Sequence, residues 1–326
     1  MTATHRLPAP RFILPTGNAM LWLALLAGVL MDVLVKLLGG NGAGGGVGVA
    51  VTVAWRWAFG LLVLLPLALC TFTRHDWTPW RHVHAQRALL NLFCTYALVL
   101  GLQQLPLALV MTIFFAEPLL MLLLAALIGR QALPRRQLLV CVVGLLGVAL
   151  ATYGDWQRAG PANGPLLLAA LIAVLGAAAG ALQTVLTQHH GVDVSSRSLV
   201  FWTSVSATAV ALPLAGPAAW ALSPGQAGLL LGVGALGTAF SLLWVGALKR
   251  VPARVAAHVL YLTLPLGALA GWWWFDETPH AVSVLGSLCV FAAVLVLERL
   301  DARRAAHERR AGPMPTPRPA PIQAGG

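Results

Sequence analysis

The sequence predicts an all-α integral membrane protein with ten transmembrane helices, arranged as two inverted five-helix repeats. Three observations lead to this fold class: long apolar blocks, a one-sided distribution of basic residues, and an internal repeat. Hydrophobic residues make up 59% of the 326 residues and charged residues only 10%, whereas soluble domains average about 25% charged residues. A chain so poor in charge could not cover the surface of a soluble fold, so a soluble protein is excluded.

The apolar blocks come first, because many of them approach the roughly 20 residues that a helix needs to cross a bilayer. Glycine, proline and charged residues separate the blocks. In chain order they predict helices at residues 19–39, 49–71, 87–104, 107–128, 137–153, 165–188, 198–216, 226–248, 253–274 and 280–298. The first block is long and no small-residue cleavage pattern follows it, so we expect a retained span and not a signal peptide.

Basic residues supply the second observation. With a cytoplasmic N-terminus, ten spans place 18 of the 21 lysines and arginines on the cytoplasmic side and only Arg158 opposite, while Lys36 and Arg56 fall within spans. A wrong helix count would scramble this asymmetry. It therefore predicts a multi-pass protein of the cytoplasmic (inner) membrane with both termini in the cytoplasm. The formal net charge of +11 is a topology signal, and no nucleic-acid partner is needed to explain it.

An internal repeat is the third observation. The segment "LQQLPLALVMTIFFAEPLLMLLLAALIGR" (102–130) resembles "LKRVPARVAAHVLYLTLPLGALAGWWWFDE" (248–277). Each has a proline opening a span, a second proline 12 or 13 residues later, and an apolar run that ends in a charged residue. Five spans per unit is an odd number, so the second unit must be inverted relative to the first. Inverted repeats are typical of secondary transporters, whose substrate site lies near the midplane between the halves.

Punctuation and composition complete the domain organisation. The predicted units are a cytoplasmic N-terminal tail (1–18), a first repeat (19–153), a second repeat (165–298) and a basic, then Pro/Gly-rich, disordered tail (299–326). The motifs "GAAAG" (176–180) and "GVGALG" (232–237) lie inside apolar spans, so they predict close helix packing and not phosphate binding. The four cysteines fall one per apolar block, which predicts neither disulfides nor a metal site.

Four segments have the order and spacing of a known family. They are "GVLMDVLVKLLG" (28–39), "VAWRWAFG" (53–60), "LPLALVMTIFFAEPLLMLLLAALIGR" (105–130) and "YLTLPLGALAGWWWFDE" (261–277). In these segments the chain resembles the EamA type of the drug/metabolite transporter superfamily. The resemblance implies two five-helix repeats and a transporter of small polar metabolites, not an enzyme. Two departures stand out: Arg130 replaces the closing Glu of the first repeat, which Glu277 keeps in the second, and Glu117 is not part of the family pattern.

Four ionisable residues lie inside predicted spans: Asp32, Lys36, Arg56 and Glu117. A charged side chain at the centre of a span costs on the order of 3 kcal/mol by insertion scales, so such residues pair or face water. With a rise of about 1.5 Å per residue, Lys36 lies nearest the outer surface, Asp32 and Arg56 about 10 Å deep, and Glu117 near the midplane. We expect a ladder along a central cavity, with Asp32 beside Arg56 and paired with Lys36 along its own helix.

Simpler explanations stay open for each of these residues. Lys36 could snorkel to the interface, Asp32 and Arg56 could form a purely structural bridge, and Glu117 could serve only as a partner for Arg56. Glu117 is nevertheless the candidate for proton coupling. It immediately precedes Pro118, which frees a backbone carbonyl from its helical hydrogen bond within the membrane.

The second repeat offers polar residues where the first has charges. Aligning "LLPLAL" (64–69) with "ALPLAG" (211–216) places Thr203 opposite Arg56, and the other candidates for substrate binding are Gln183, His258 and Tyr261. His258 is equally well explained as a packed, hydrogen-bonded histidine. The tryptophans at 272–274 fall at the predicted outer interface, where indoles are favoured, so they predict an aromatic belt in preference to a ligand site.

These charges predict a secondary transporter that moves a small polar metabolite by alternating access. Arg56 or Lys36 would meet an anionic group and Asp32 an ammonium, which suits a zwitterion related to an amino acid. A membrane enzyme acting on lipid would need a catalytic cluster, for which only "TRHDWTPWRHVHAQR" (73–87) is available, and a scaffold would not need four buried charges. The predicted partners are the substrate and membrane lipid, a homodimer is compatible with the pattern, and no cofactor or metal is predicted.

Overall fold

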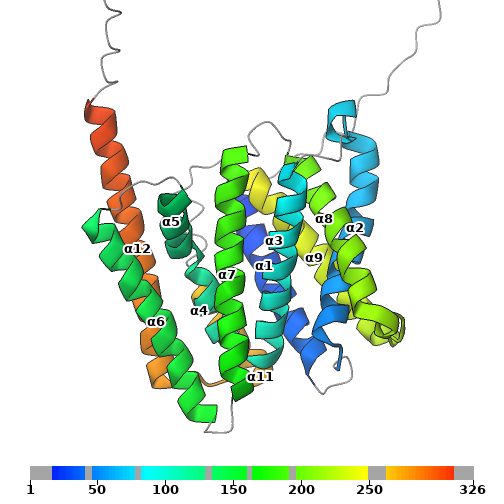
Figure 1. The fold of residues 1–326 in the computed structure, drawn as a ribbon. Helices are drawn as coiled ribbons and strands as arrows, with labels where there is room; N and C mark the ends of the chain where they lie inside the picture. The colour runs from blue at the N-terminus through cyan, green and yellow to red at the C-terminus, as the bar shows by residue number, and fades with distance from the viewer. Residues whose placement is uncertain are drawn as a thin grey trace, which may run out of the picture.

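The structure, a computed structural model, describes residues 17–40, 46–77, 82–128, 134–159, 164–190, 196–248 and 262–311. All regular secondary structure in these ranges is helical (Figure 1). The elements are α1 (Gly17–Gly39), α2 (Val49–Thr71), η1 (Arg74–Trp77), α3 (His82–Gln104), α4 (Leu107–Phe115), α5 (Glu117–Ile128), α6 (Arg135–Ala159), α7 (Gly164–His190), α8 (Ser196–Ala215), η2 (Gly216–Trp220), α9 (Pro224–Leu248), α11 (Thr263–Phe275) and α12 (Ala281–Ala311).

The predicted membrane class is confirmed. Within the described residues, eight helical stretches are long and apolar enough to cross a bilayer, and Ala281–Leu297 of α12 is a shorter apolar stretch. The predicted span at 253–274 is only partly described: its first part lies outside the described residues, and its second part is α11.

Three helices are longer than predicted, because they continue past the apolar block into polar sequence. They are α3, which begins at His82, α6, which ends at Ala159, and α12, which ends at Ala311, against predicted limits of 87, 153 and 298. Arginine, glutamate and glutamine are good helix formers in water, so a helix can continue beyond the hydrocarbon. The basic segment at 299–311 thus continues α12, while residues 312–326 of the predicted Pro/Gly-rich disordered tail lie outside the described residues.

The fourth predicted span is interrupted in the middle. α4 ends at Phe115, Ala116 forms a turn, and α5 begins at Glu117. Pro118 explains the interruption, because it has no N–H for the carbonyl four residues earlier and its ring clashes with that turn. α11 likewise begins close to a proline, Pro265. Interrupted helices at corresponding positions of two halves are a pointer to the binding site of a transporter.

Helices of the first predicted repeat pack mainly against helices of the second. α6 lies along α12, α1 along α9, α3 along α7 and α2 along α8, and α4 contacts α11 (Figure 1). Exchanging the two predicted repeats turns the α1–α9 contact into the α7–α3 contact and maps the α6–α12 and α2–α8 pairs onto themselves. The smaller α2–α9 and α3–α8 contacts also exchange with each other. This is the pattern of contacts that a two-fold relation between the units would produce.

Glycines bring α6 and α12 into backbone contact. A Cβ added at Gly147 would lie 2.9 Å from the carbonyl oxygen of Gly286 and 3.0 Å from the backbone nitrogen of Val290. Small residues at a helix interface allow this approach, and helix association in lipid depends on such packing because no hydrophobic force drives it. The α6–α12 pair is therefore held by shape complementarity at its glycines.

The two glycine motifs have the packing role that the sequence predicts. Gly176 of "GAAAG" faces Ala97 on α3, and Gly234 of "GVGALG" lies against the backbone of Phe59 and Gly60 on α2. Any side chain at these two glycines would overlap the neighbouring helix. The motifs therefore set the spacing of the α3–α7 and α2–α9 pairs.

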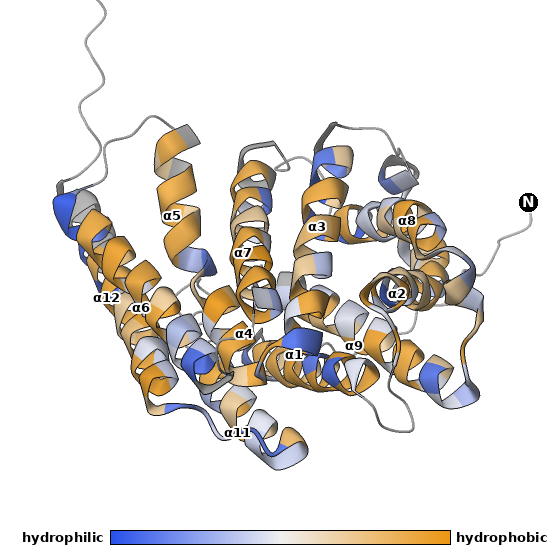
Figure 2. Cartoon of the chain, turned by 60° about the horizontal axis from the view of Figure 1, so that its bottom comes forward, coloured by the Kyte–Doolittle hydropathy of each residue, from blue (hydrophilic) through white to orange (hydrophobic). Residues whose placement is uncertain are grey.

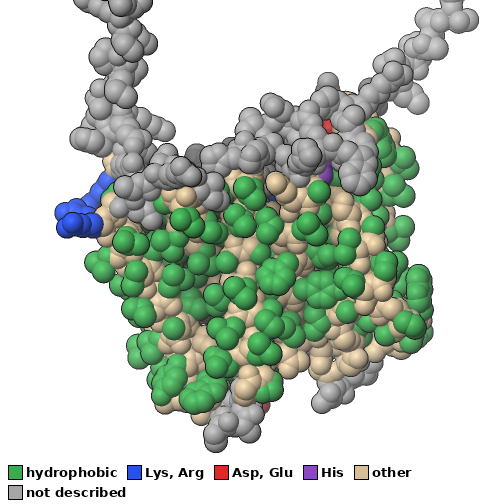
Figure 3. Space-filling model, in the orientation of Figure 1, with side chains coloured by type: hydrophobic (Ala, Val, Ile, Leu, Met, Phe, Trp, Pro, Cys, Tyr) green, Lys and Arg blue, Asp and Glu red, His purple; other side chains and the backbone are tan. Residues whose placement is uncertain are grey.

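The outside of the bundle is apolar. Figure 3 shows hydrophobic side chains spread over the visible face of the molecule, and Figure 2 shows that most of the helical ribbon is hydrophobic. Large exposed residues such as Leu69, Leu146 and Trp273 contribute to this surface. A soluble protein rarely exposes so much apolar area, whereas lipid solvates it. The three tryptophans at 272–274 are all exposed, and their role as an aromatic belt stays a prediction.

We expect Gly147→Ala to destabilise the protein, because the new methyl group would meet backbone atoms of α12 that cannot rotate away. The loss should be about 1–3 kcal/mol, the usual range for overpacking, measured as a lower midpoint of thermal unfolding in detergent. Gly228→Ala on α9 is the control, since an added Cβ there has no neighbour within 4 Å among the described residues. Equal midpoints of the two variants would contradict the close α6–α12 contact.

Candidate functional site

Arg56 on α2 is held inside the bundle by residues from three helices. Its Nη1 donates a hydrogen bond to Thr95 Oγ1 on α3 at 2.9 Å, and its guanidinium lies 5.1 Å from the ring centroid of Trp57, within the range of a cation–π contact. Its Nε lies 3.4 Å from the place of a Cβ at Gly237 on α9. Gly237 ends the motif "GVGALG", so the missing side chain there makes room for the guanidinium.

Glu117, the first residue of α5, faces α7 and α3. Thr184 Oγ1 on α7 lies 3.4 Å from Glu117 Oε1 and can donate to it, and the same hydroxyl reaches the carbonyl of Gly180 at 3.0 Å. Gly180 also makes room for the carboxylate: a Cβ there would lie 3.5 Å from Oε1 and 3.3 Å from Cys94 Sγ. A carboxylate in the first turn of a helix is stabilised by the partial positive charge of that end.

A single turn of α3 connects Arg56 with Glu117. Thr95 contacts Arg56, and its neighbour Cys94 approaches the same glycine of α7 as Glu117 does. The structure thus brings together two of the four buried charges from distant parts of the chain. The arrangement spans α2, α3, α5, α7 and α9, so it involves both predicted repeats.

Asp32 on α1 is the third member of this central cluster. Its side chain is 8% exposed, and its Oδ1 has no hydrogen-bond partner among the described residues. Asp32 and Arg56 act on each other electrostatically, but within the described helices they do not approach to the 4.0 Å of an ion pair. A buried carboxylate oxygen without a partner is costly. Oδ1 is therefore placed to receive a cationic or hydrogen-bond-donating group.

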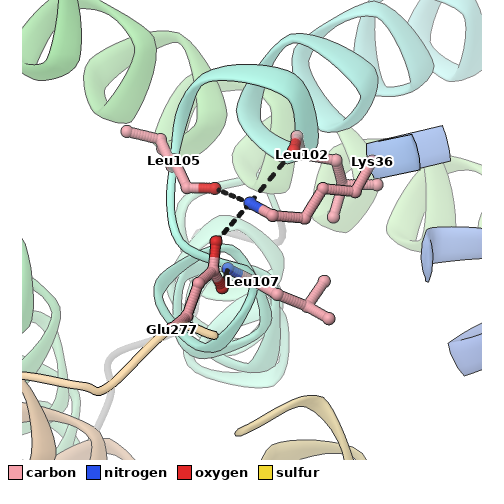
Figure 4. A network of polar contacts seen from close by, with 5 residues as sticks. All are labelled: Lys36, Leu102, Leu105, Leu107 and Glu277. Carbon is pink, nitrogen blue, oxygen red and sulfur yellow. Dashed lines mark hydrogen bonds and ion pairs between the residues drawn. The ribbon is translucent and has the colours of Figure 1, made fainter. Parts of the chain in front are cut away.

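Lys36 does not pair with Asp32 along α1, so the predicted intrahelical pairing is wrong. Instead its Nζ lies 2.7 Å from Oε1 of Glu277, which follows the end of α11 (Figure 4). The same ammonium donates to the carbonyl oxygen of Leu105 at 2.6 Å and lies 3.5 Å from that of Leu102. We refer to the Lys36–Glu277 pair as the outer ion pair, since it falls on the predicted extracytoplasmic side.

Helix ends explain why the outer ion pair forms at this point. Pro106 lies between α3 and α4 and has no N–H to donate to the carbonyl of Leu102. The carbonyl of Leu105 follows the end of α3 and has no helical partner either. The first N–H of α4, that of Leu107, donates to Glu277 Oε2 at 2.8 Å. The ammonium therefore lies at the negative end of α3 and the carboxylate at the positive end of α4.

The turn after α11 places the carboxylate of Glu277. Asp276 has φ 53° and ψ 30°, the left-handed conformation that often ends a helix and that aspartate tolerates. The N–H of Glu277 then donates to the carbonyl of Gly271 at 3.1 Å. A Cβ at Gly271 would lie 2.9 Å from Glu277 Oε2, so this glycine leaves the space that the carboxylate occupies.

Among the remaining predicted site residues, Thr203 is not joined to these clusters by the described hydrogen bonds. The hydroxyl of Thr203 donates to the carbonyl of Leu199 on its own helix at 2.7 Å, and Thr203 is buried. On α7 it is Thr184, the neighbour of Gln183, that reaches Glu117. His258 and Tyr261 lie outside the described residues.

Sequence reasoning misses Glu277, Thr95 and Cys94 as site residues. The sequence does contain an indication for Glu277. It is an acid in a predicted outer segment that has few charges, and Lys36, the only lysine within a predicted span, also lies near the outer surface. Thr95 and Cys94 carry none. Short polar side chains in apolar helices more often bond their own backbone than a neighbouring charge.

The start of the 73–87 segment, the only candidate for an enzyme's catalytic cluster, has a structural role. Asp76 Oδ2 accepts hydrogen bonds from the N–H and the hydroxyl of Thr73 at 3.0 and 2.8 Å. Its backbone carbonyl accepts from Ser198 and Trp202 of α8. The acid of this loop thus fixes a turn and docks it onto α8.

A cavity of about 930 Å³ lies beside the outer ion pair, between α4, α6, α11 and α12. Glu277 forms part of its wall, and most of the remainder is apolar. Its hydroxyl groups are paired: Thr112 and Ser287 lie 2.7 Å apart, and Ser283 donates to Asp155 Oδ1 at 2.8 Å. The cavity gives a small molecule room next to Glu277.

Comparison with known proteins agrees with the fold. The model of the EamA-like transporter family matches residues 17–153 and 167–299, which together are most of the chain. A solved structure described only as "Crystal structure of protein" superposes with a TM-score of 0.59 at 17% identity, over 89% of this chain and 98% of that one. The likeness to that structure shows a shared fold.

Three relatives have the name S-adenosylmethionine uptake transporter. The protein of Rickettsia prowazekii (strain Madrid E) is 26% identical over 236 residues, or 72% of this chain and 78% of the relative. That of Rickettsia bellii (strain RML369-C) is 26% identical over 72% and 79%, and that of Rickettsia felis (strain ATCC VR-1525 / URRWXCal2) is 25% identical over 72% and 78%. With the family model matched over both halves of its length, the chain belongs to the EamA-like transporter family and is a multi-pass membrane transporter, not an enzyme.

Proposed function

We propose that the protein is a secondary transporter that carries a small, zwitterionic metabolite across the cytoplasmic (inner) membrane by alternating access. The observation that carries the proposal is the central cluster of Asp32, Arg56 and Glu117. These residues come from α1, α2 and α5, and their contacts reach α3, α7 and α9. Charges of both signs are thus buried between helices of both repeats, beside an interrupted span, where transporters bind their substrates.

The same proposal includes ten helices in two inverted five-helix repeats. Two findings support it: the helix contacts exchange between the units as a two-fold relation requires, and the family model matches one segment before residue 153 and another after residue 167. A site between two such units can face each side of the membrane in turn when one unit rocks against the other.

Each charge of the central cluster has a distinct role in this proposal. The guanidinium of Arg56 binds the anionic group of the substrate, because its planar donors match a carboxylate. Asp32 Oδ1, which has no partner among the described residues, accepts the ammonium or another cationic group. Glu117, held against Thr184 at the break of the fourth span, is the candidate for carrying a proton.

S-adenosylmethionine is the first substrate to test, since the three relatives carry its name. This metabolite combines a carboxylate and an ammonium with a sulfonium cation. One basic and two acidic side chains in the central cluster complement such a charge pattern. Amino acids share the first two groups and form the second substrate class to test.

We expect Glu117→Gln to slow uptake of radiolabelled S-adenosylmethionine into proteoliposomes roughly tenfold, equivalent to losing about 1.4 kcal/mol of interaction. An amide cannot take up a proton, so the remaining uptake should no longer respond to an imposed pH gradient. Asp276→Asn, which removes an acid outside the central cluster, is the control. An unchanged rate and an unchanged response to the gradient would remove Glu117 from the mechanism.

A double substitution separates substrate binding from a structural bridge between Asp32 and Arg56. Arg56→Gln alone should destabilise the protein by about 3 kcal/mol, because it leaves a buried carboxylate without its nearby positive charge. Adding Asp32→Asn should restore much of the unfolding midpoint but not the uptake. A double variant that transports at the wild-type rate would show that the two charges only support the fold.

Single cysteines in a cysteine-free background test the proposed orientation. A membrane-impermeant maleimide added to intact cells should label Thr278→Cys, which follows α11 and is exposed. It should label Arg303→Cys, which is exposed near the end of α12, only after the membrane is permeabilised. The reverse pattern would place both termini outside the cytoplasm.

A further inference from the structure

Glu277 occupies a position that has the features of a carboxylate-binding site. One of its oxygens lies 2.7 Å from the ammonium of Lys36, and the other accepts the N–H of Leu107 at 2.8 Å (Figure 4). A cationic side chain together with the first N–H of a nine-residue helix is a common way to bind an anion. The ring of Phe275 lies 5.3 Å from the same ammonium and shields it on one side.

We propose that Lys36 and the N-terminus of α4 form the outer binding site for the carboxylate of the substrate, and that Glu277 fills this site while the outer side is closed. An incoming substrate carboxylate then displaces Glu277. This inference rests on the proposed transport function and assigns Lys36 and Glu277 their parts in it.

Displacement of Glu277 would also disconnect the two repeats. Lys36 belongs to α1, and its acceptors Leu102 and Leu105 lie in the last turn of α3 and directly after it, whereas Glu277 follows α11. The outer ion pair is therefore a polar link across the interface that has to separate if the outer side opens. Binding of a carboxylate and opening become one event, because the same ammonium takes part in both.

Charge balance explains why the exchange requires a carboxylate. If Glu277 left without a replacement, the largely buried ammonium would remain among backbone carbonyls without a counter-charge, which is unfavourable. A substrate carboxylate keeps the charge at Lys36 constant. A ligand that lacks this group cannot replace Glu277, so the exchange selects for acids and zwitterions.

The geometry gives such a ligand access and an onward path. Glu277 and Pro106 line the cavity of about 930 Å³, and the side chains of Lys36 and Glu277 are 12% and 23% exposed. The pair is thus neither sealed nor fully solvated. Asp32 lies one helical turn deeper on the same face of α1 as Lys36, so it is the next charged group along α1 toward the central cluster.

The test uses two substrates that differ in one carboxylate: S-adenosylmethionine and its decarboxylated form. In proteoliposomes, the wild-type protein should take up S-adenosylmethionine with a KM at least about tenfold lower than that of the decarboxylated compound. Lys36→Gln should bring the two KM values together by raising that of S-adenosylmethionine. Equal KM values in the wild-type protein would overturn the proposal.

Removing the internal competitor gives the opposite effect. Glu277→Gln should lower the KM for S-adenosylmethionine by up to about fivefold, the range expected for a partly exposed ion pair. Gly271→Ala should shift KM in the same direction, because its Cβ would displace the Glu277 carboxylate while both charges remain. Asp276→Asn is the matched control, since asparagine also tolerates the left-handed conformation, and its KM should not change.

The outcomes distinguish this inference from the proposed function. A wild-type protein that takes up neither compound nor any amino acid would count against the transport proposal itself. Uptake of S-adenosylmethionine with the same KM in Glu277→Gln and Asp276→Asn would reject only the carboxylate exchange. Should Glu277→Gln fail to fold, Gly271→Ala provides the same comparison, and an unchanged KM there would be equally decisive.

Discussion

A bilayer offers no water to a buried charge or to an unpaired backbone carbonyl, and both polar clusters of this protein follow from that constraint. At the outer ion pair, a single lysine takes up carbonyls at the end of α3, and a single glutamate takes up the first N–H of α4. Each charge thus satisfies a helix end as well as the other charge. In the proposed exchange, this connection opens when a group of the same charge replaces Glu277.

The central cluster meets the same constraint only in part. Arg56 has the hydroxyl of Thr95 and Glu117 that of Thr184, whereas Asp32 Oδ1 has no partner among the described residues. Buried polar groups in proteins are nearly always satisfied, and exceptions occur where function requires them. In the proposed function, this incompletely satisfied set of charges beside the broken helix is the substrate site before the substrate binds.

The sequence predicts the class of fold because the relevant signals are local. Runs of apolar residues, prolines, glycine motifs and the distribution of arginines are each visible within one segment. They indicate the spans, the freed carbonyl before Pro118 and the glycine contacts, whereas the predicted span at 107–128 does not include the break between α4 and α5. Pairing between side chains is not local. Lys36 and Glu277 are separated by most of the chain, and although Glu277 is an acid on the predicted outer side, the sequence does not favour it over Asp32, which is nearer along the helix. The ends of α3, α6 and α12 also escape prediction, because a helix in water needs no apolar signal.

The outer ion pair has no charged equivalent at the other side of the membrane if the two units are inverted repeats. The alignment that sets Thr203 opposite Arg56 also sets Gln183 opposite Lys36, and Arg130 corresponds to Glu277. A glutamine and an arginine cannot form an ion pair, so the inner positions lack the attraction that closes the outer side. Arg130 also satisfies the preference for basic residues at the cytoplasmic surface. Arg130, which stands where the family pattern has a glutamate, therefore makes the inner side of the transporter chemically different from the outer side. In the proposed mechanism, this difference favours a resting state in which the outer side is closed. Binding of a substrate carboxylate at Lys36 then opens the outer side.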